Sequence, residues 1–521
     1  MLPLSLFGLL LLLPYSYGLN FPFSLPFASK HRAQVPIEAP APFVKSPHKV
    51  AIIGAGAGGS SAAYWLARAQ NRTPEHELEV EIFEKEGYIG GRSTVVFPYS
   101  SEEYRPIELG ASIFVKANRN LWRAAQEFNL SFAEYDGEDG EFAIWDGSEF
   151  RFRMTNGSFS WWDTARLLWR YGINAPRRSQ ALVDEIVKEY MRLYNPLTPD
   201  WTDVSDISAF LNFSNFTSGT TAAYLKSQGI DEKYIVEMVE SMTRVNYGQN
   251  VDGIHALEGM VSQAANGAAS VAGGNYQLFE QFVLRSKAKI HLNTTVKSLS
   301  QSNKKWTLKT SDGSTKTFDS VILAAPFHST GISITPALPS RIPKQPYVHL
   351  HVTLLSTPYH QPNPTYFNLK EGSSAPQIVL TTNDGFIRGG PAPEFNSMTY
   401  HGRAGGTGEA KDENVVKIFS ADKIEDEWLE KTFGTVGWVY RKEWDAYPVL
   451  PPTEAFPPVM PTESLYYVNS FEPFISTMET ETISSLNTVR LLLQNVFGVN
   501  STICEVPESE EAEEILKGWD C

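Results

Sequence analysis

The sequence predicts an α/β fold with a nucleotide-binding unit and a second, mixed α+β domain. The apolar run Val50 to Ile53 breaks into glycines and then into small and apolar residues at helical spacing, in "VAIIGAGAGGSSAAYWLARA", which predicts strand, tight turn and helix. A further apolar run, "LEVEIFEKE", predicts the next strand. The chain has 521 residues, of which 42% are hydrophobic, and this is enough for two or three domains.

The turn after the first strand carries Gly54, Gly56 and Gly59, which is the G-x-G-x-x-G spacing of a Rossmann-type domain. Gly54 allows the sharp turn, Gly56 lets the backbone approach a pyrophosphate, and Gly59 lets the helix pack closely on the strand. The pyrophosphate would lie at the helix N-terminus, where the dipole favours negative charge by about 0.3–1 kcal/mol. The alternative is a strand–turn–helix that binds no nucleotide.

Glu84 ends the second predicted strand, and its carboxylate is expected to accept hydrogen bonds from a ribose 2′-hydroxyl. It lies further from the loop than the usual ~20 residues because the polar stretch "QNRTPEHELE" intervenes as a surface loop.

The N-terminus predicts entry into the secretory pathway. The leucine-rich block within residues 1–18 is shorter than the ~20 residues that span a bilayer, so we expect a signal peptide, with an uncleaved anchor as the alternative. Residues 19–47 form a Pro-rich lead-in, and no other transmembrane run follows. Seven N-x-[ST] sequons are candidate glycosylation sites: Asn71, Asn129, Asn156, Asn212, Asn215, Asn293 and Asn500.

Composition excludes some classes of function. The net charge is −15 and no basic run stands out, which disfavours nucleic-acid binding. No metal site is predicted, because the ten histidines are scattered, and His349 and His351, which alternate on one strand, are interpreted as structural. The two cysteines, Cys504 and Cys521, are expected to form a disulfide in an oxidising compartment, within a solvated acidic tail over residues 501–521.

The segment after Glu84, "GYIGGRSTVV", resembles the flavoproteins of the amine oxidase and glutathione reductase superfamily. The resemblance implies FAD as cofactor, with the backbone of Gly91 and the side chain of Arg92 helping to hold its phosphates. "IELGASIF", from Ile107 to Phe114, is similar to the segment that passes beside the flavin ring. No second G-x-G-x-x-G follows a strand, so a reductase with two Rossmann units is not expected.

Two later segments resemble the same superfamily. A helix from about Tyr276 and a strand ending near Val296 are similar to the segment whose valine backbone contacts the adenine. Near the C-terminus, Ser476 and Glu479 predict a capping box at the start of a helix. In the superfamily such a helix directs its N-terminus at the flavin pyrimidine ring.

The predicted domains are discontinuous. The FAD-binding domain comprises residues 48–135, 273–330 and 435–500, and the substrate domain comprises residues 136–272 and 331–434.

The segment "RVNYGQ", Arg244 to Gln249, and the "GGN" at Gly273 to Asn275 resemble the prenylcysteine oxidase (prenylcysteine lyase) family over roughly residues 48–500. The resemblance implies an FAD thioether oxidase that uses O2 and water to convert S-farnesyl- or S-geranylgeranyl-cysteine to cysteine, an isoprenoid aldehyde and hydrogen peroxide. It also implies a lysosomal or vacuolar location, with secretion as the alternative, and a prenylated substrate is compatible with peripheral membrane contact. Candidate residues for the substrate mouth are Arg244, Asn246, Tyr247 and Gln249, and the alternative is a polar turn that supports the flavin.

Two other functions remain open from the sequence. A flavin amine oxidase or polyene desaturase would use the same scaffold, and a secreted flavin-fold glycoprotein without catalysis would bind a partner instead.

Overall fold

The computed structural model describes residues 46–133, 140–154, 161–265, 267–405, 412–498 and 515–521. The predicted signal peptide, nearly all of the Pro-rich lead-in, Asn156, Asn500 and Cys504 lie outside the described residues.

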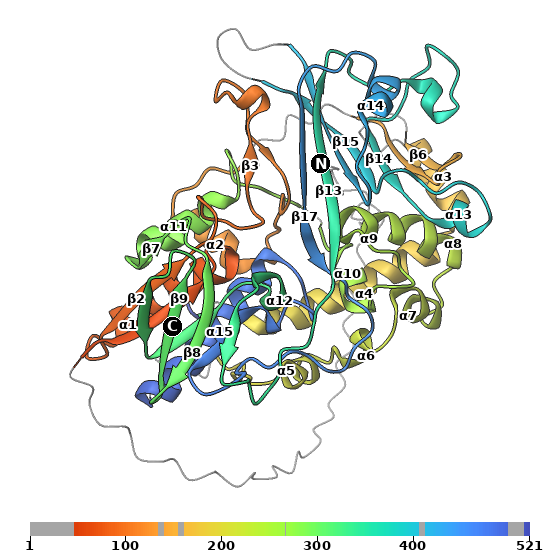
Figure 1. Ribbon diagram of the computed structural model, residues 1–521. Helices are drawn as coiled ribbons and strands as arrows, with labels where there is room; N and C mark the ends of the chain where they lie inside the picture. The colour runs from red at the N-terminus through yellow and green to blue at the C-terminus, as the bar shows by residue number, and fades with distance from the viewer. Residues whose placement is uncertain (1–45, 134–139, 155–160, 266, 406–411, 499–514) are drawn as a thin grey trace, which may run out of the picture.

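A five-stranded parallel sheet lies at the centre of the nucleotide-binding unit (Figure 1), and its strand order is β18-β11-β1-β2-β7. The strands are β1 (His48–Ile53), β2 (Leu78–Phe83), β7 (Lys289–His291), β11 (Ser320–Leu323) and β18 (Leu465–Tyr467). On one face Val50 and Ile52 pack in a core that includes helix α1 (Ala57–Arg72), and α11 (Tyr276–Ser286) and α15 (Met478–Phe497) pack against α1. Helix α2 (Arg119–Glu127) contacts both α11 and α15.

A four-stranded sheet covers the opposite face. Its order is β10-β9-β8-β12, formed by β8 (Val296–Ser302), β9 (Lys305–Thr310), β10 (Thr315–Phe318) and β12 (Ser333–Thr335). Ala51 and Ile53 of β1 share a core with Trp306 of β9. The parallel sheet is therefore buried on both faces, as parallel sheets usually are.

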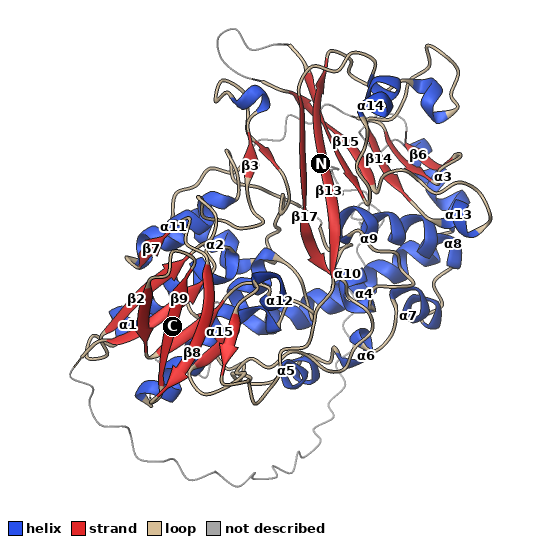
Figure 2. Ribbon diagram, viewed as in Figure 1, coloured by secondary structure: helices blue, strands red, loops and turns tan. Residues whose placement is uncertain are grey.

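The second domain contains a seven-stranded sheet with a layer of helices beside it (Figure 2). Its order is β17-β13-β16-β15-β14-β5-β6, with β5 (Phe142–Trp145), β6 (Phe150–Met154), β13 (Tyr347–Thr357), β14 (Ile378–Thr381), β15 (Ser397–Arg403), β16 (Asn414–Ser420) and β17 (Val439–Pro448). The helices are α3 (Trp161–Tyr171), α4 (Asn174–Met191), α5 (Val204–Phe210), α6 (Ser214–Thr217), α7 (Thr221–Ser227), α8 (Glu232–Tyr234), a π-helical turn (Ile235–Val239), α9 (Glu240–Tyr247) and α10 (Ala256–Val261).

Short elements complete the chain. A two-stranded ribbon, β3 (Val95–Val96) and β4 (Ile107–Glu108), runs between the two large sheets, and α12 (Phe327–Thr330), α13 (Asp384–Ile387) and α14 (Asp426–Phe433) lie in the connections. The predicted α/β class, with a Rossmann-type domain and a second mixed domain, is confirmed.

Two of the predicted boundaries are corrected by strand pairing. β17 pairs with β13 in the seven-stranded sheet, so the third segment of the nucleotide-binding domain begins after residue 448 and not at 435. Val296 begins β8, whereas a strand ending there was expected, because the turn after β7 returns the chain into the four-stranded sheet. That turn lies beside the end of β2, since the amide of Thr294 donates to the carbonyl of Glu84 over 2.7 Å. The adenine contact of Val296 stays a prediction.

The C-terminus also differs from the expected solvated tail. Trp519 is 2% exposed, and its indole nitrogen donates to the side chain of Asn120 over 3.0 Å. Arg68 and Arg72 on α1 donate to the carbonyl of Trp519. The apolar residues near the end pack on α1 although the tail as a whole is acidic. Cys521 is disulfide-bonded, and its predicted pairing with Cys504 stays a prediction.

Candidate active site

The turn between β1 and α1 has no room for side chains at two of its glycines. Gly54 has a φ of +102°, and a Cβ there would lie 2.5 Å from the carbonyl oxygen of Ala324 at the end of β11. A Cβ on Gly59 would lie 1.9 Å from the carbonyl oxygen of Gly54. Helix and strand can therefore approach this closely only because both residues lack a side chain.

Gly56, in contrast, has room for a side chain. A Cβ there would contact nothing closer than 3.8 Å, where it meets Gly90 and Gly91. Gly56 and Gly90 form a parallel bridge, so the two glycine segments lie side by side. No side chain caps α1, and the N–H groups of residues 57–59 have no acceptor within the part of the chain that the structure describes. Free amides at a helix N-terminus are suited to a pyrophosphate.

The glycine turn and the N-terminus of α1 together form a cradle. Buried polar atoms without hydrogen-bond partners in the described part of the chain lie beside it. The Glu481 carboxylate would lie 2.9 Å from a Cβ on Gly58, and its Oε1 has no hydrogen-bond partner among the described residues. The same holds for Asn469 Oδ1 and for the hydroxyls of Ser93 and Ser470. Because buried polar groups normally have partners, this set fits a polar dinucleotide in the cradle.

Glu84 lies where β1 and β2 end, as predicted from its place after the second strand. Its carboxylate accepts from the amide of Ala55 over 2.7 Å and from that of Glu86 over 2.9 Å, and the residue is 6% exposed. It therefore braces the glycine loop. Its hydrogen bond to a ribose stays a prediction.

Arg92 lies beside the cradle, with a carboxylate as its partner. Its guanidinium forms an ion pair with Glu472 over 2.5 Å and donates to the carbonyl of Ala446 over 2.9 Å. Tyr347 donates to Glu472 over 2.5 Å, and the Asn469 amide joins Glu472 to Glu481 over 3.3 and 3.2 Å. Burial raises the pKa of Glu481 to about 8, and the negative charge of Glu472 adds to the rise. The predicted contact of Arg92 with phosphate stays a prediction, and sequence reasoning missed Glu472 and Glu481.

The predicted Ser476–Glu479 capping box is wrong by one residue. Thr477 is the N-cap of α15, where its hydroxyl accepts from the amide of Thr480 and its own amide donates to the Thr480 hydroxyl, both over 3.0 Å. Threonine hydroxyls can make both bonds of the box, so the helix begins one residue later than expected.

Glu479 thereby becomes free to cap another helix. It accepts from the amides of Asn120 and Leu121 over 2.8 and 2.9 Å and from the Tyr194 hydroxyl over 2.6 Å. It lies at the N-terminus of α2, where the helix dipole favours a carboxylate. Burial raises its pKa to about 7, against these hydrogen bonds. Both of its carboxylate oxygens are engaged by these protein groups, and its predicted contact with the cofactor stays a prediction.

Arg244 lies in the last turn of α9 and faces the seven-stranded sheet. Its three guanidinium nitrogens donate to Thr381, Asn250 and Asn396 over 2.9, 2.8 and 3.0 Å. These acceptors are neutral, and no carboxylate of the described residues forms an ion pair with Arg244. The side chain is partly accessible. The nearby acid is Glu240, one turn earlier on α9, which acts on the pKa of Arg244 without an ion pair. A guanidinium whose hydrogen-bond partners are neutral is suited to an anionic ligand.

The other three candidates in "RVNYGQ" are bound to the protein. Gln249 is buried, donates to the carbonyl of Pro448 over 3.1 Å and accepts from the amide of Leu450 over 2.8 Å. Tyr247 is 6% exposed, and Asn246 donates to the carbonyl of Ser262 over 3.1 Å. These three residues fit the alternative interpretation, in which this segment is a polar turn that supports the flavin. Arg244 is then the charged candidate for the substrate mouth.

A second pair of buried charges joins the segment "IELGASIF" to β16. Lys417 on β16 donates to the carbonyl of Glu108 over 3.0 Å and to the Ser112 hydroxyl over 3.1 Å. Burial lowers the pKa of Lys417 to about 8 and raises that of Glu108 to about 7. Glu108 accepts from the amide of Asn275 over 2.5 Å, which joins this segment to the "GGN" motif. Sequence reasoning missed this pair, since the two residues lie 309 positions apart.

The glycine cradle, the uncapped helix and the separate sheet domain together define a dinucleotide-binding protein with a Rossmann-type domain and a second domain. The fold agrees with this class. It is similar to cyclohexylamine oxidase from Brevibacterium oxydans, with a TM-score of 0.56 and 16% identity, over 86% of this chain and 99% of that one. Putrescine oxidase bound to putrescine is also similar, with a TM-score of 0.56 and 14% identity over the same shares.

The sequence comparisons are more specific. The family described as prenylcysteine lyase matches residues 154–504, and an NAD(P)-binding Rossmann-like domain matches residues 52–128. Farnesylcysteine lyase of Arabidopsis thaliana is 29% identical over 464 residues, which cover 86% of this chain and 88% of that protein. Prenylcysteine oxidase 1 of Homo sapiens is 28% identical over 479 residues, with 85% and 88% covered. The chain belongs to the prenylcysteine lyase family.

Proposed function

We propose that this protein oxidises the thioether of S-farnesyl- or S-geranylgeranyl-cysteine, with O2 and water as co-substrates. The products are cysteine, an isoprenoid aldehyde and hydrogen peroxide. The observation that carries the proposal is Arg244, a guanidinium with neutral partners in a segment typical of this family. It offers a site for the substrate carboxylate.

The reaction follows from the substrate. The glycine turn and the N-terminus of α1 would hold FAD, which would supply a hydride acceptor for the carbon between sulfur and the alkene. The resulting cation is shared by the sulfur lone pairs and the allyl group, so water adds at that carbon. The hemithioacetal then collapses, the C–S bond breaks, and sulfur leaves as the cysteine thiol. O2 takes the two electrons as peroxide, which balances the reaction.

The chain supplies binding and proton transfer. Arg244 orients the cysteine head by charge-assisted hydrogen bonds, which are about twice as strong as neutral ones. Water must lose a proton and sulfur must gain one. Glu108 lies on the segment that resembles the flavin-facing one, and Lys417 on β16 lies beside it. With pKa values of about 7 and about 8, the two groups can exchange protons near neutral pH.

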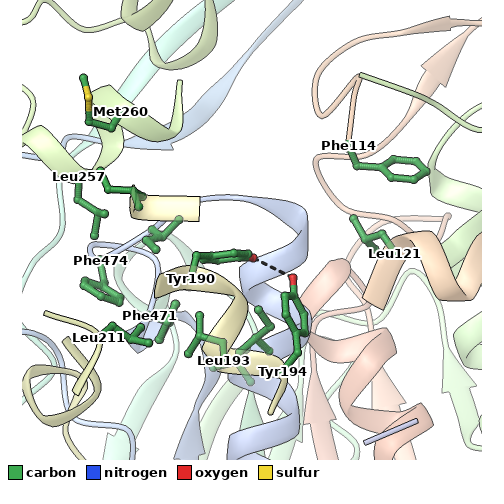
Figure 3. Close-up of a cluster of buried hydrophobic side chains, with 14 of the residues drawn as sticks. Phe114, Leu121, Tyr190, Leu193, Tyr194, Leu211, Leu257, Met260, Phe471 and Phe474 are labelled. Atoms are coloured by element: carbon green, nitrogen blue, oxygen red, sulfur yellow. Dashed lines mark hydrogen bonds between the residues drawn. The ribbon is translucent and has the colours of Figure 1, made fainter. Parts of the chain in front are cut away.

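An isoprenoid tail requires an apolar environment, and buried apolar side chains gather beside α15. Figure 3 shows a buried cluster from several elements: Phe114, Leu121, Tyr190, Leu193, Tyr194, Leu211, Leu257, Met260, Phe471 and Phe474. Tyr194 also donates to Glu479 in the first turn of α15, so the cluster reaches that helix. A farnesyl tail of about 15 carbons has a gross burial ceiling near 12 kcal/mol, at about 0.8 kcal/mol per CH₂. The tail therefore dominates affinity, before ordering costs.

A lysosomal or vacuolar location is part of the proposal. The five sequon asparagines within the described residues, Asn71, Asn129, Asn212, Asn215 and Asn293, are all exposed and so accessible to glycosylation. The disulfide at Cys521 suits an oxidising compartment.

Peripheral contact with a membrane is supported by helix α3. Trp161, Trp162 and Trp169 are 68%, 60% and 87% exposed. Arg170 and Tyr171 bind Glu237 over 2.6 and 2.8 Å and fix the opposite side of the helix. The exposed residues from 161 to 178 are Trp161, Trp162, Arg166, Trp169, Gly172, Ile173, Asn174, Arg177 and Arg178, with no acid among them. Tryptophan and arginine on one face suit an anionic lipid surface. None of the described helices has the length and apolar character to cross a bilayer.

Vesicle sedimentation tests this contact. We expect the protein to bind vesicles of phosphatidylcholine with phosphatidylserine, and changing the three tryptophans of α3 to serine to weaken binding by about 10-fold or more. Leu197→Ser, at another exposed apolar residue, is the control. Equal binding by the triple variant, or binding to a second copy of the chain instead of vesicles, would refute the assignment.

The catalytic proposal is tested with a panel of substrates. Purified protein with S-farnesylcysteine in aerobic buffer should give cysteine, farnesal and peroxide in equal amounts. Putrescine is the comparison substrate for the amine oxidase alternative. Oxidation of putrescine but not of farnesylcysteine would contradict the proposal, and a protein purified without flavin would favour the non-catalytic alternative.

A further inference from the structure

Two histidines and two carboxylates meet across the edge of the seven-stranded sheet. His349 and His351 alternate on β13, and they pair in register with Asp445 and Glu443 on β17. His349 Nε2 and His351 Nδ1 each lie 3.9 Å from Glu443 Oε2. The three ligand atoms all lie within 4.8 Å of one another.

We propose that His349, His351 and Glu443 bind a divalent transition-metal ion. Tetrahedral zinc takes imidazole nitrogen at about 2.0–2.1 Å and carboxylate oxygen at about 2.0–2.2 Å, so its ligand atoms lie roughly 3.3 Å apart. The observed separations need only a small closing movement. The side chains of His349 and Glu443 are 56% and 67% exposed, so they are free to make it. A water molecule would complete the coordination.

Asp445 supplies the hydrogen bond that a metal-binding histidine usually has. Its carboxylate lies 3.3 Å from Nδ1 of His349, on the side of the ring away from Glu443. A proton held on Nδ1 by Asp445 leaves the Nε2 lone pair directed at the site. Such carboxylate–histidine–metal arrangements fix the tautomer and ring orientation, and losing the carboxylate typically costs 10–100-fold in affinity.

The neighbouring charges leave Glu443 available. Arg441, two residues before Glu443 on β17, is engaged by Asp426 and by the carbonyl of Ile424. Lys442 follows on the other side of the strand, where its ammonium lies 5.8 Å from the Trp444 ring.

The ligand set indicates which ions bind. Imidazole nitrogen suits zinc, copper and nickel, whereas magnesium and calcium prefer oxygen ligands. Copper(II) should bind most tightly by the Irving–Williams order, and zinc, which has no redox chemistry, is suited to a structural site.

The ion would join β17, the edge strand, to β13. Trp444 lies between Glu443 and Asp445 on β17 and packs on the other face, where its ring would lie 2.9 Å from a Cβ on Gly110. The metal site thus braces a strand that touches the segment "IELGASIF", but it lies on the opposite face of the sheet. We place it outside the proposed catalytic machinery.

Zinc binding to the flavin-loaded protein tests the proposal. The protein is purified without a polyhistidine tag, stripped with EDTA and titrated with Zn²⁺ against a chromophoric chelator. We expect one zinc per chain. The double variant His349→Gln/His351→Gln should lose at least 100-fold in affinity, and Asp445→Asn about 10-fold with unchanged stoichiometry. His360→Gln, at an exposed histidine outside the cluster, is the matched control.

Copper(II) provides a second measurement. Its EPR spectrum should show two nitrogen ligands, and these signals should disappear in the double variant. Flavin content equal to that of the wild type verifies that the variants are folded. Wild-type affinity for zinc in the double variant, no zinc binding below about 100 µM, or a copper spectrum without nitrogen ligands would each overturn the site.

Discussion

Gly56 and Gly59 lie in one turn but meet different surroundings. Gly59 is closed in by the carbonyl of Gly54, whereas the space at Gly56 extends to the backbones of Gly90 and Gly91. Gly56 has φ −77° and ψ −165°, an extended conformation that residues with side chains also adopt. A side chain is therefore compatible with the fold at Gly56 but not at Gly59.

We expect Gly56→Val to fold and to lose its FAD, because the valine would occupy the space of the pyrophosphate. Flavin absorbance per chain measures the loss, and the Tm of the flavin-free protein measures folding. Gly59→Val is the comparison, and it should yield little folded protein. Full flavin content in Gly56→Val would show that the pyrophosphate lies elsewhere.

Arg244 gives a prediction about substrate recognition. Arg244→Gln removes the positive charge and leaves at most two side-chain N–H donors for the acceptors on Thr381, Asn250 and Asn396. A hydrogen bond to a charged group contributes about 1.5–3 kcal/mol, so kcat/KM for S-farnesylcysteine should fall roughly 10- to 150-fold, mainly through KM.

S-farnesylcysteamine, which lacks the carboxylate, is the discriminating substrate. The wild type and Arg244→Gln should turn it over equally if Arg244 binds that carboxylate. An equal loss on both substrates, or loss of flavin, would instead make Arg244 a structural residue.

Among the elements, the short C-terminal segment 515–521 packs against α1 through several contacts. Trp519 contacts Trp65 and Tyr64, with ring centroids 5.3 and 5.4 Å away, and hydrogen-bonds Asn120 on α2. Lys517 donates to the carbonyl of Thr198 over 2.7 Å. This short segment therefore ties the nucleotide-binding domain to the start of the helical layer.

Trp519→Ala should destabilise the protein by about 3–5 kcal/mol, the usual cost of removing a buried aromatic side chain. A lower Tm and a lower midpoint of urea unfolding measure the effect. Trp169→Ala, at an 87% exposed tryptophan, should change neither. A Trp519→Ala protein with wild-type stability would mean that the C-terminal segment does not pack on α1 in solution.

The sequence predicted the parts of the site that are close in the chain. The glycine spacing and Glu84 lie within one strand–helix–strand unit, where local pattern and turn chemistry decide the structure. The pairs Arg92–Glu472 and Lys417–Glu108 join residues 380 and 309 positions apart, and no local pattern contains that information. The Thr477 cap was missed because serine and threonine are equally good caps and Ser476 precedes it by one residue. The packing of the C-terminal segment was not predicted, because the tail is mainly acidic and only two of its apolar residues, Leu516 and Trp519, join the core.

Over the whole molecule, buried carboxyl groups dominate the titration between pH 6.5 and 8. Burial raises the pKa of Glu258 and Glu481 to about 8, and that of Glu479 and Glu108 to about 7. A carboxyl group with a raised pKa binds more protons in the folded state than in the unfolded state. Its contribution to stability is therefore lost as pH rises through the folded pKa. Buried His255, whose pKa burial lowers to about 4, acts in the opposite direction below about pH 6.5. Lys417 and Lys517, whose pKa burial lowers to about 8, also act in the opposite direction, but only as the pH approaches 8.

We therefore expect the Tm to fall as pH rises from 6.5 to 8. The free energy of unfolding should decrease by up to about 2 kcal/mol for each of the two carboxyls with a pKa of about 8. Glu258→Gln should flatten the slope, because an amide keeps a hydrogen-bonding group beside Tyr247 and Ser476 but does not titrate. Glu454→Gln, at an exposed carboxylate, is the control and should leave the slope unchanged. Scanning calorimetry at one protein concentration and one scan rate measures all three proteins. A wild-type Tm that rises over this range would show that these carboxyls are ionised in the folded protein, and an unchanged slope in Glu258→Gln would exclude Glu258 as a source.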